Sequence, residues 1–376
     1  MTADLIPPWE KEDAFPEKPT DKEYGYIHRG KSVGCSREEL IKKCGSRDDF
    51  SVIHLVWCPE WPRVTPAAKV AFLSDALYQR RGNQLSTTIQ VGWFCLLIWG
   101  ALSLLDGGRT RVWMLFVAIS TGLIPLLMGY HGRRKLKGNR AYIMEEQLAV
   151  ERYHAWVLSR RIVFTWVLLG AIATVFALQF FDFTKSASAA GLDKAAVWRG
   201  EWWRLLTGPL LHGNPMHFIF NASVLVGLGR LMEVLASRYH LALVFLISAM
   251  TGSIFSLFLL PNVTSVGASG GLLGLIGFLA VLGVKRKQTL PPGFARSMAL
   301  NVAIIAAMGI FAYALIDNAA HLGGFLAGIV LGLCLIDSND RCLPLMSSRK
   351  IQFAGTLALA LTLGFAGFAM FRLLPH

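Results

Sequence analysis

The chain has 376 residues, of which 54% are hydrophobic and 16% are charged, and its mean hydropathy is +0.47. Because soluble globular chains carry about 25% charged residues, this composition excludes an ordinary soluble domain and predicts an all-α polytopic membrane helical bundle. The net charge of +13 would also suit nucleic-acid binding, but the basic residues cluster just beyond apolar runs, as in 131–140 and 284–287. That pattern is typical of cytoplasmic loops, so we expect contact with the lipid bilayer and no nucleic acid partner.

Residues 1–87 form a polar N-terminal segment that we expect in the cytoplasm. Residues 1–50 are rich in Pro, Lys, Glu and Asp, which predicts a loosely ordered stretch. Residues 51–85 indicate a small compact module, with a helix that Thr65 caps and in which Pro66 takes the first position. No basic stretch followed by an apolar run opens the chain, so a signal peptide is not expected.

Three of the six cysteines, Cys35, Cys44 and Cys58, lie in this N-terminal segment at irregular gaps, close to His28 and His54. A zinc site is one interpretation, but the gaps lack the paired CxxC spacing of structural zinc sites. The spacing therefore argues against a zinc site without excluding one.

Apolar segments long enough to cross a bilayer occupy the rest of the chain, at 88–105, 112–130, 162–182, 216–236, 241–260, 268–284, 298–316, 319–336 and 353–372. The first two predict a transmembrane hairpin over 88–130. Basic residues at 131–140, 159–161 and 284–287 put the N-terminus in the cytoplasm of a multi-pass protein of an inner or plasma membrane. The loop 183–211 then lies outside; its three Trp and two Arg within VWRGEWWRLLTGPLL suggest a segment at the membrane interface, which is also how a simple aromatic anchor would look.

Among the polar side chains inside apolar segments, where such groups are costly and often functional, four stand out: His217, Asn221, Ser269 and His321. The orientation above places all of them within about two turns of the outer ends of their helices. They therefore share one depth although they are far apart in sequence. His217 and Asn221, four residues apart, also share a helix face.

Glycines follow two of these residues at helical spacing. Gly270, Gly271, Gly274 and Gly277 follow Ser269, and Gly324, Gly328 and Gly332 follow His321. Small residues four apart let two membrane helices approach closely. The two helices are therefore expected to bring Ser269 and His321 within hydrogen-bonding distance.

Such a group has the parts of an acyl-transfer site. A neutral imidazole, His321, could remove the proton of the Ser269 hydroxyl, while His217, the Asn221 amide and the Ser269 N–H could stabilise an oxyanion. Each residue alone has a simpler explanation: a serine that starts a helix is usually a cap, and an Asn or His in a span commonly bonds between helices. Their common depth and the paired glycines favour the site.

The sequence resembles the rhomboid family of intramembrane serine proteases. The matching motifs are Trp203–Arg204, the HxxxN of His217 and Asn221, the GxSG from Gly267 to Gly270, and the AHxxGxxxG from Ala320 to Gly328. The resemblance covers roughly 160–336 and implies a six-helix protease core, with 353–372 similar to the extra C-terminal helix of some members.

The resemblance implies that Ser269 is the nucleophile, that His321 is its base, and that His217, Asn221 and the Ser269 amide form the oxyanion hole. Gly267, Gly270, Trp203 and Arg204 would support this site, while Arg230 and Glu233 would be structural. The implied partners are transmembrane protein substrates, cut near the outer membrane face without metal or cofactor. Leu273 and Ile316 depart from the family, which often has an aromatic residue and a glycine at these positions.

Other interpretations remain open. A relative that binds membrane proteins in quality control typically lacks the Ser or the His, and a solute transporter would predict internal repeats that the sequence does not have. Asp317 lies four residues before His321 and could orient its imidazole, or it could simply cap the eighth apolar helix at its outer end.

Overall fold

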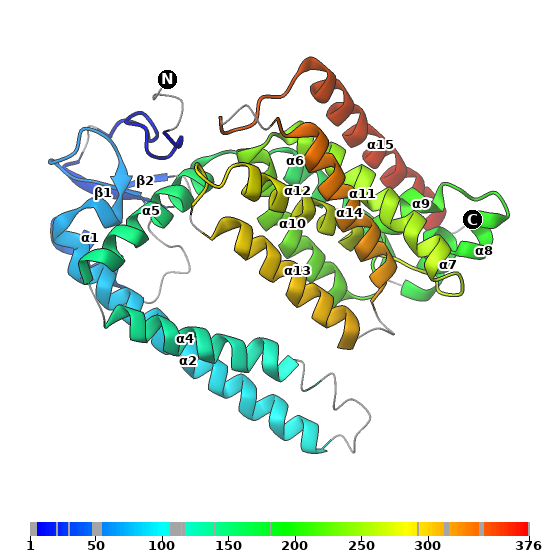
Figure 1. The fold of residues 1–376 in the computed structure, drawn as a ribbon, viewed down its shortest axis with the longest axis horizontal. Coiled ribbons are helices and arrows are strands. Elements are labelled where there is room, and N and C mark those ends of the chain that lie inside the picture. Colours follow the sequence, from blue (N-terminus) through cyan, green and yellow to red (C-terminus); the bar gives the residue numbers. More distant parts are fainter. Residues whose placement is uncertain are drawn as a thin grey trace. The chain divides into compact units, whose positions relative to one another are not determined.

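The computed structural model describes residues 6–19, 22–28, 31–46, 55–105, 114, 117–137, 140–180, 182–291, 293–311, 316–337 and 342–374. The chain forms two compact units. One comprises residues 8–159, and the other comprises residues 160–376 together with residues 1–7. Figure 1 shows that helices make up most of the chain and that a small sheet lies near the N-terminus.

The N-terminal unit contains a four-stranded antiparallel sheet in the order β2-β1-β3-β4. Its strands are β1 (Tyr24–His28), β2 (Lys31–Cys35), β3 (Leu55–Trp57) and β4 (Thr65–Pro66). Helix α1 (Arg37–Gly45), capped by Ser36, packs its buried Leu40 and Cys44 into the same core as Val56 of β3. The all-α prediction is therefore wrong for the four strands, and the loose order expected over 1–50 is wrong for residues 24–28 and 31–45. The strands have only two to five residues, too few to show a clear alternating pattern, and β1 also pairs with β3 beyond α1, which local composition does not report.

The helix expected to start at Thr65 is also wrong. Thr65 and Pro66 pair with Val56 and Leu55 as the edge strand β4, and two short 3₁₀ turns, η2 (Ala67–Lys69) and η3 (Ala71–Leu73), follow. Proline is tolerated at a sheet edge because it does not need to donate to the ladder. Helix α2 begins only at Ser74 and continues to Leu105.

The predicted hairpin is helical where the structure describes it. Helix α2 runs beside the short π-helix η4 (Ile119–Leu123) and α4 (Ile124–Leu136). Figure 1 shows α2 and α4 side by side. A Cβ at Gly92 would lie 2.9 Å from the Gly122 carbonyl oxygen, so small residues set the approach of the two arms. Helix α5 (Arg140–Ser159) completes this unit.

Every apolar segment predicted beyond residue 160 corresponds to one helix of the second unit. These helices are α6 (Phe164–Gln179), α10 (Pro215–Leu235), α11 (Arg238–Leu259), α12 (Ser269–Lys285), α13 (Phe294–Phe311), α14 (Asn318–Leu335) and α15 (Arg349–Leu373). Between α6 and α10 lie the short helices α7 (Phe183–Ala190), α8 (Lys194–Trp198), α9 (Arg204–Thr207) and the 3₁₀ turn η5 (Gly208–Leu210). The continuous apolar runs in the sequence therefore predict these helices well.

The chain is a multi-pass membrane protein. Within the described parts, five helices are long and apolar enough to cross a bilayer: Ala71–Leu104, Pro215–Leu235, Arg238–Leu259, Asn318–Leu335 and Arg349–Leu373. The bent pair Val150–Ser159 and Phe164–Gln179 would make a sixth, and α12 and residues 294–307 are shorter apolar helices. The division into 1–87, 88–130, 160–336 and 353–372 stays a prediction.

Helix α12 lies at the centre of the second unit. Residues 270–279 are all buried, and α10, α11, α13 and α14 pack around it. Glycines along α12 let these neighbouring helices approach it closely from several sides. Its first residue, Ser269, is therefore surrounded by the neighbouring helix ends.

Glu233 of α10 holds the start of α6 in this bundle. Its carboxylate accepts from the backbone N–H groups of Val163 (2.9 Å), Phe164 (3.3 Å) and Thr165 (2.7 Å), and from the Thr165 hydroxyl (2.6 Å). A carboxylate at a helix N-terminus satisfies unpaired donors and complements the helix dipole. These bonds fit the structural role expected for Glu233, while Arg230 donates to the Arg160 carbonyl oxygen (3.2 Å).

Candidate active site

Ser269 and His321 lie in hydrogen-bonding contact. Ser269 Oγ is 2.8 Å from His321 Nε2, although the residues are 52 positions apart in sequence. Ser269 is the first residue of α12, and His321 lies in the first turn of α14. The two helix ends thus form a serine–imidazole pair with the geometry that base-assisted nucleophilic attack requires.

Close packing of glycines on α12 and α14 produces this contact. A Cβ at Gly324 would fall inside contact distance of the Gly270 carbonyl oxygen, and one at Gly328 would do the same at Gly274. A Cβ at Gly270 would lie 3.3 Å from the Ala320 carbonyl oxygen. The two backbones therefore approach as the glycine spacing predicts.

The stretch 265–267, which leads into Ser269, is held by backbone hydrogen bonds to neighbouring segments. Ser265 exchanges backbone hydrogen bonds with Leu192 (2.9 and 3.1 Å), and the Gly267 N–H donates to the Gly208 carbonyl oxygen (3.1 Å). Gly267 has φ +128°, a conformation open mainly to glycine. Because Ser269 then opens α12, its backbone N–H belongs to the first turn, where N–H groups have no partner within the helix.

His217 and Asn221 of α10 flank this stretch. A Cβ at Gly267 would lie 2.8 Å from His217 Nε2 and 3.6 Å from Asn221 Nδ2, so both side chains face the residues just before Ser269. Asn214 caps α10 by accepting from the His217 N–H (2.9 Å). Two potential donors thus lie beside the stretch that leads into Ser269, where they could serve an oxyanion hole.

His212 is a site residue that the sequence reasoning missed. Its Nε2 lies 3.0 Å from Asn221 Nδ2, and the residue is completely buried. The side chain of Gln179, at the end of α6, forms two hydrogen bonds with the His212 backbone. It donates to the His212 carbonyl oxygen (3.1 Å) and accepts from the His212 N–H (2.9 Å). A glutamine inside the apolar segment 162–182 was the available signal, since buried polar groups in a membrane helix require partners.

Trp203 and Arg204 brace the interfacial segment. Arg204 is buried, and its guanidinium donates to the carbonyl oxygens of Ser188 (3.0 Å) and Gly191 (2.8 Å) and to the Glu201 carboxylate (2.7 Å). The Trp203 ring packs edge-on against Phe368 of α15 (centroids 5.1 Å apart). The Arg204 and Arg372 guanidinium groups approach the Trp203 ring at 4.6 and 5.3 Å, within cation–π range. These residues hold the backbone around the site and do not reach the dyad through any of these contacts.

Asp317 does not orient the imidazole of His321 through its observed bonds. Its Oδ1 accepts from the Ala320 N–H (2.8 Å), which makes it the N-cap of α14, and its Oδ2 accepts from the Ser256 hydroxyl. The capping interpretation of Asp317 is therefore confirmed, and the direct carboxylate–imidazole pairing has no support. The cap still matters to the site, because it fixes the first turn of the helix that carries His321.

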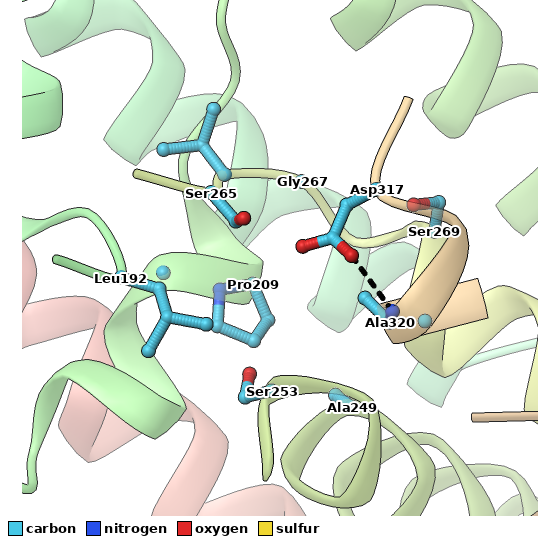
Figure 2. A pocket seen from close by; sticks show the side chains of 12 residues that line it. Leu192, Pro209, Ala249, Ser253, Ser265, Gly267, Ser269, Asp317 and Ala320 are labelled. Carbon is cyan, nitrogen blue, oxygen red and sulfur yellow. Dashed lines mark hydrogen bonds between the residues drawn. The ribbon is translucent and has the colours of Figure 1, made fainter. Parts of the chain in front are cut away.

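A small cavity of about 20 Å³ opens beside the nucleophile, enough for about one water molecule. Figure 2 shows Ser265, Gly267, Ser269, Asp317 and Ala320 around it, with the bond from Ala320 to Asp317 dashed. Ser253 and Ala249 of α11 close the opposite side. The lining mixes hydroxyl and carboxylate oxygens with small and apolar residues, and Ser269 is part of it.

Metal chemistry has no support among the residues that the structure describes, where no group of three or more His, Cys, Asp or Glu side chains gathers. Cys44 and Cys58 are buried in the N-terminal unit, and burial raises the pKa of the Cys44 thiol to about 12. His54, part of the zinc interpretation, lies outside the described residues.

Residues 199–338 match the model of the rhomboid domain. The chain carries a rhomboid domain. Its match spans the site from the interfacial segment to the end of α14, so the resemblance of the motifs is confirmed.

Relatives of this rhomboid domain include the rhomboid protease GluP of Bacillus subtilis (strain 168), 30% identical over 146 residues, which are 38% of this chain and 28% of the relative. RHOMBOID-like protein 4 of Arabidopsis thaliana is 36% identical over 148 residues, covering 39% of this chain and 37% of the relative. The chain thus matches well under half of the length of these relatives. A third, named inactive RHOMBOID-like protein 8 of Arabidopsis thaliana, is 28% identical over 135 residues, 36% of this chain and 38% of the relative. A rhomboid domain therefore does not by itself imply activity.

Proposed function

We propose that the protein is an intramembrane serine endopeptidase that cleaves transmembrane segments of other membrane proteins. The observation that carries the proposal is the 2.8 Å contact between Ser269 Oγ and His321 Nε2 at the N-terminus of a buried helix. The adjacent His217 and Asn221 side chains add support, because a hydroxyl–imidazole pair without oxyanion donors would be a poor catalyst.

In the proposed reaction, Ser269 Oγ attacks the carbonyl carbon of the scissile peptide and its proton passes to His321 Nε2. The carbonyl oxygen takes the negative charge and accepts from the Ser269 N–H, the Asn221 amide and His217. Collapse of this intermediate breaks the C–N bond, and His321 returns the proton to the leaving amine. A water molecule, activated by the same imidazole, then hydrolyses the acyl-enzyme and regenerates Ser269.

The proposed substrates are transmembrane helices cut near the outer face of the membrane. All the site residues lie at the N-terminal ends of α10, α12 and α14, and the basic loops place these ends outside with the N-terminus in the cytoplasm. A substrate helix must locally unwind there, since a peptide bond within a helix is shielded by its own turns.

A fluorophosphonate probe tests this proposal on the purified full-length chain. We expect covalent labelling of the wild type, mapped by peptide mass to Ser269, and no labelling of Ser269→Ala. The same Ser269→Ala variant should lose cleavage of a model transmembrane substrate by several orders of magnitude. A matched control is Ser253→Ala, which removes a hydroxyl on the far side of the cavity.

A folded wild type that neither labels at Ser269 nor cleaves would favour the alternative, a binding-only member of the family. Labelling that persists in Ser269→Ala would exclude this serine as the nucleophile. Thermal unfolding in detergent should be similar for the wild type and Ser269→Ala, because alanine suits a helix start packed among small residues.

A further inference from the structure

Lys194, the first residue of α8, is a buried lysine that the proposed reaction does not use. The residue is 2% exposed, and its ammonium donates hydrogen bonds to the Val263 carbonyl oxygen and to Ser265 Oγ. A buried ammonium needs hydrogen-bond acceptors and an opposite charge, because a low-dielectric interior penalises an isolated ion. The acceptors are in place, and the opposite charge lies further along the same network.

A directed chain of hydrogen bonds leads from this ammonium to a carboxylate. Ser256 Oγ of α11 donates to Asp317 Oδ2 and lies 3.2 Å from Ser265 Oγ. Because the single hydroxyl proton of Ser256 points to Asp317, the proton between the two serines comes from Ser265. Each hydroxyl accepts on the lysine side and donates on the carboxylate side, so the two charges at the ends reinforce every bond between them.

This network joins the two segments that deliver the reacting side chains. Val263 and Ser265 belong to the extended stretch that enters α12 at Ser269, and Asp317 caps α14 one turn before His321. Figure 2 shows Ser265, Asp317 and Ser269 around one cavity. A change at the lysine end would therefore alter both partners of the hydroxyl–imidazole contact.

We propose that Lys194 is a positioning residue for the Ser269–His321 dyad. Its ammonium holds the stretch before the nucleophile through Ser265. Through Ser265 and Ser256 it also fixes the Asp317 side chain, whose bond to the first turn of α14 sets the position of the imidazole. The inference rests on the proposed protease function and adds to it a charged group, outside the matched motifs, on which the dyad depends.

The charge on Lys194 gives this proposal a pH signature. Burial lowers the pKa of Lys194 from 10.5 to about 8, while the carboxylates of Asp317 and Asp193 oppose part of that change. Asp193 caps α8 itself, Asp317 faces the network from α14, and the contacts from α11 and the entering stretch are neutral hydroxyl and carbonyl groups. The ammonium is therefore present below about pH 8 and lost above it.

Raising the pH above 8 should change folding stability in the opposite direction to activity. Since the pKa of Lys194 is lower in the folded chain than in the unfolded chain, its contribution to folding stability increases as the pH rises from about 8 to 10.5. A loss of activity above pH 8 that comes from Lys194 is consequently not a loss of folded protein. Thermal unfolding measured at each pH separates the two.

The experiment measures the rate of fluorophosphonate labelling of Ser269 in the full-length chain on both sides of pH 8. We expect the wild-type rate to fall above about pH 8. Lys194→Met should label at least about tenfold more slowly below that pH and lose the decline, as the loss of a charge-assisted hydrogen bond predicts. Lys194→Arg, which stays protonated, should move the decline to higher pH.

Lys185→Met is the matched control, since it removes an exposed lysine of the same interfacial segment, with a side chain 88% exposed; its rate and pH profile should equal those of the wild type. Wild-type rate and profile in folded Lys194→Met would overturn the inference while leaving the protease function intact. If Lys194→Met does not fold, an identical alkaline decline in the wild type and Lys194→Arg overturns it instead. A wild type that fails to label at any pH contradicts the protease function itself.

Discussion

At the scale of single residues, the site combines a reacting pair with groups that only hold it. Ser269 and His321 are in contact at 2.8 Å, and Asn221 is itself held by His212 at 3.0 Å. The amide of Asn221 has two hydrogens, so one can bond to His212 while the other remains free for an oxyanion. Binding and orientation of that charge are therefore expected to depend on residues beyond the reacting pair.

The oxyanion donors should act on turnover more than on substrate binding. We expect His217→Ala and Asn221→Ala each to lower kcat, by up to about 100- to 1000-fold for loss of a donor, with a smaller change in KM, because the charge exists only in the transition state. Cleavage kinetics of a model transmembrane substrate measure both constants. Wild-type kcat in the two single variants and in the double variant would contradict these assignments.

His212→Phe tests whether His212 works through Asn221. Phenylalanine keeps a ring against Phe176 and Phe218 but removes Nε2. We expect kcat to fall about fivefold, corresponding to the ~1 kcal/mol of one hydrogen bond. In an Asn221→Ala background the same change should cost little more, since the shared interaction is already gone. Additive losses in this double-mutant cycle would mean that His212 acts independently.

At the scale of elements, the catalytic contact depends on how closely α12 and α14 pack. The first-turn residues of two helices meet only because glycines face backbone along the shared length, at Gly274 against Gly328 and Gly277 against the Phe325 carbonyl oxygen. Protein interiors are close-packed, so one added methyl group at such a point must displace a backbone. Helix separation and activity are therefore coupled.

Gly328→Ala measures this coupling. The added methyl group should reduce unfolding stability by about 1–3 kcal/mol and slow probe labelling of Ser269, because it pushes α14 from α12. Gly364→Ala on α15 is the control, since a Cβ there meets no atom within 4 Å. Thermal unfolding in detergent and labelling rates should differ between the two variants. Equal stabilities and equal labelling rates in the two variants would show that glycine packing does not determine the Ser269–His321 contact.

At the scale of the whole molecule, the rhomboid domain is preceded by a separate unit that carries its own core. The sheet, α1 and the hairpin lie within residues 8–159, and the domain match begins only at residue 199. Basic residues end α4, at Arg133, Arg134 and Lys135. They indicate that this end of the hairpin lies in the cytoplasm.

Cysteine labelling of intact cells tests the proposed orientation. On a background without native cysteines, Lys185→Cys in the interfacial segment should react with an impermeant maleimide from outside. Ser32→Cys on the exposed strand β2 should react only after permeabilisation. Both positions are exposed, so a difference in reactivity reports the side of the membrane. The reverse result would overturn the orientation and with it the outer-face position of the site.

The sequence by itself determined the long helices of the second unit, the glycine packing and the contact between Ser269 and His321. Hydropathy, the spacing of small residues and the motifs around Ser269 and His321 are local or nearly local properties. They can therefore be recognised in the sequence without knowledge of the fold. The same reasoning failed for residues 24–28 and 31–45 and for Thr65, because strands of two to five residues are too short to show a clear alternating pattern. The pairing of β1 with β3 also crosses α1, and local composition does not report it.

Only the tertiary structure decided which polar residues support the dyad. Asp317 was recognised four residues before His321, but its bonds to Ala320 and Ser256 depend on the position of α11. Lys194 and His212 were not singled out at all, since a lysine in a loop and a histidine before a span look like ordinary surface residues. Their burial and their partners arise from segments more than sixty and thirty positions away in sequence, at Ser265 and Gln179. The electrostatics of a buried site follow from such distant neighbours, because in a low-dielectric interior the nearest charges and hydrogen-bond partners dominate.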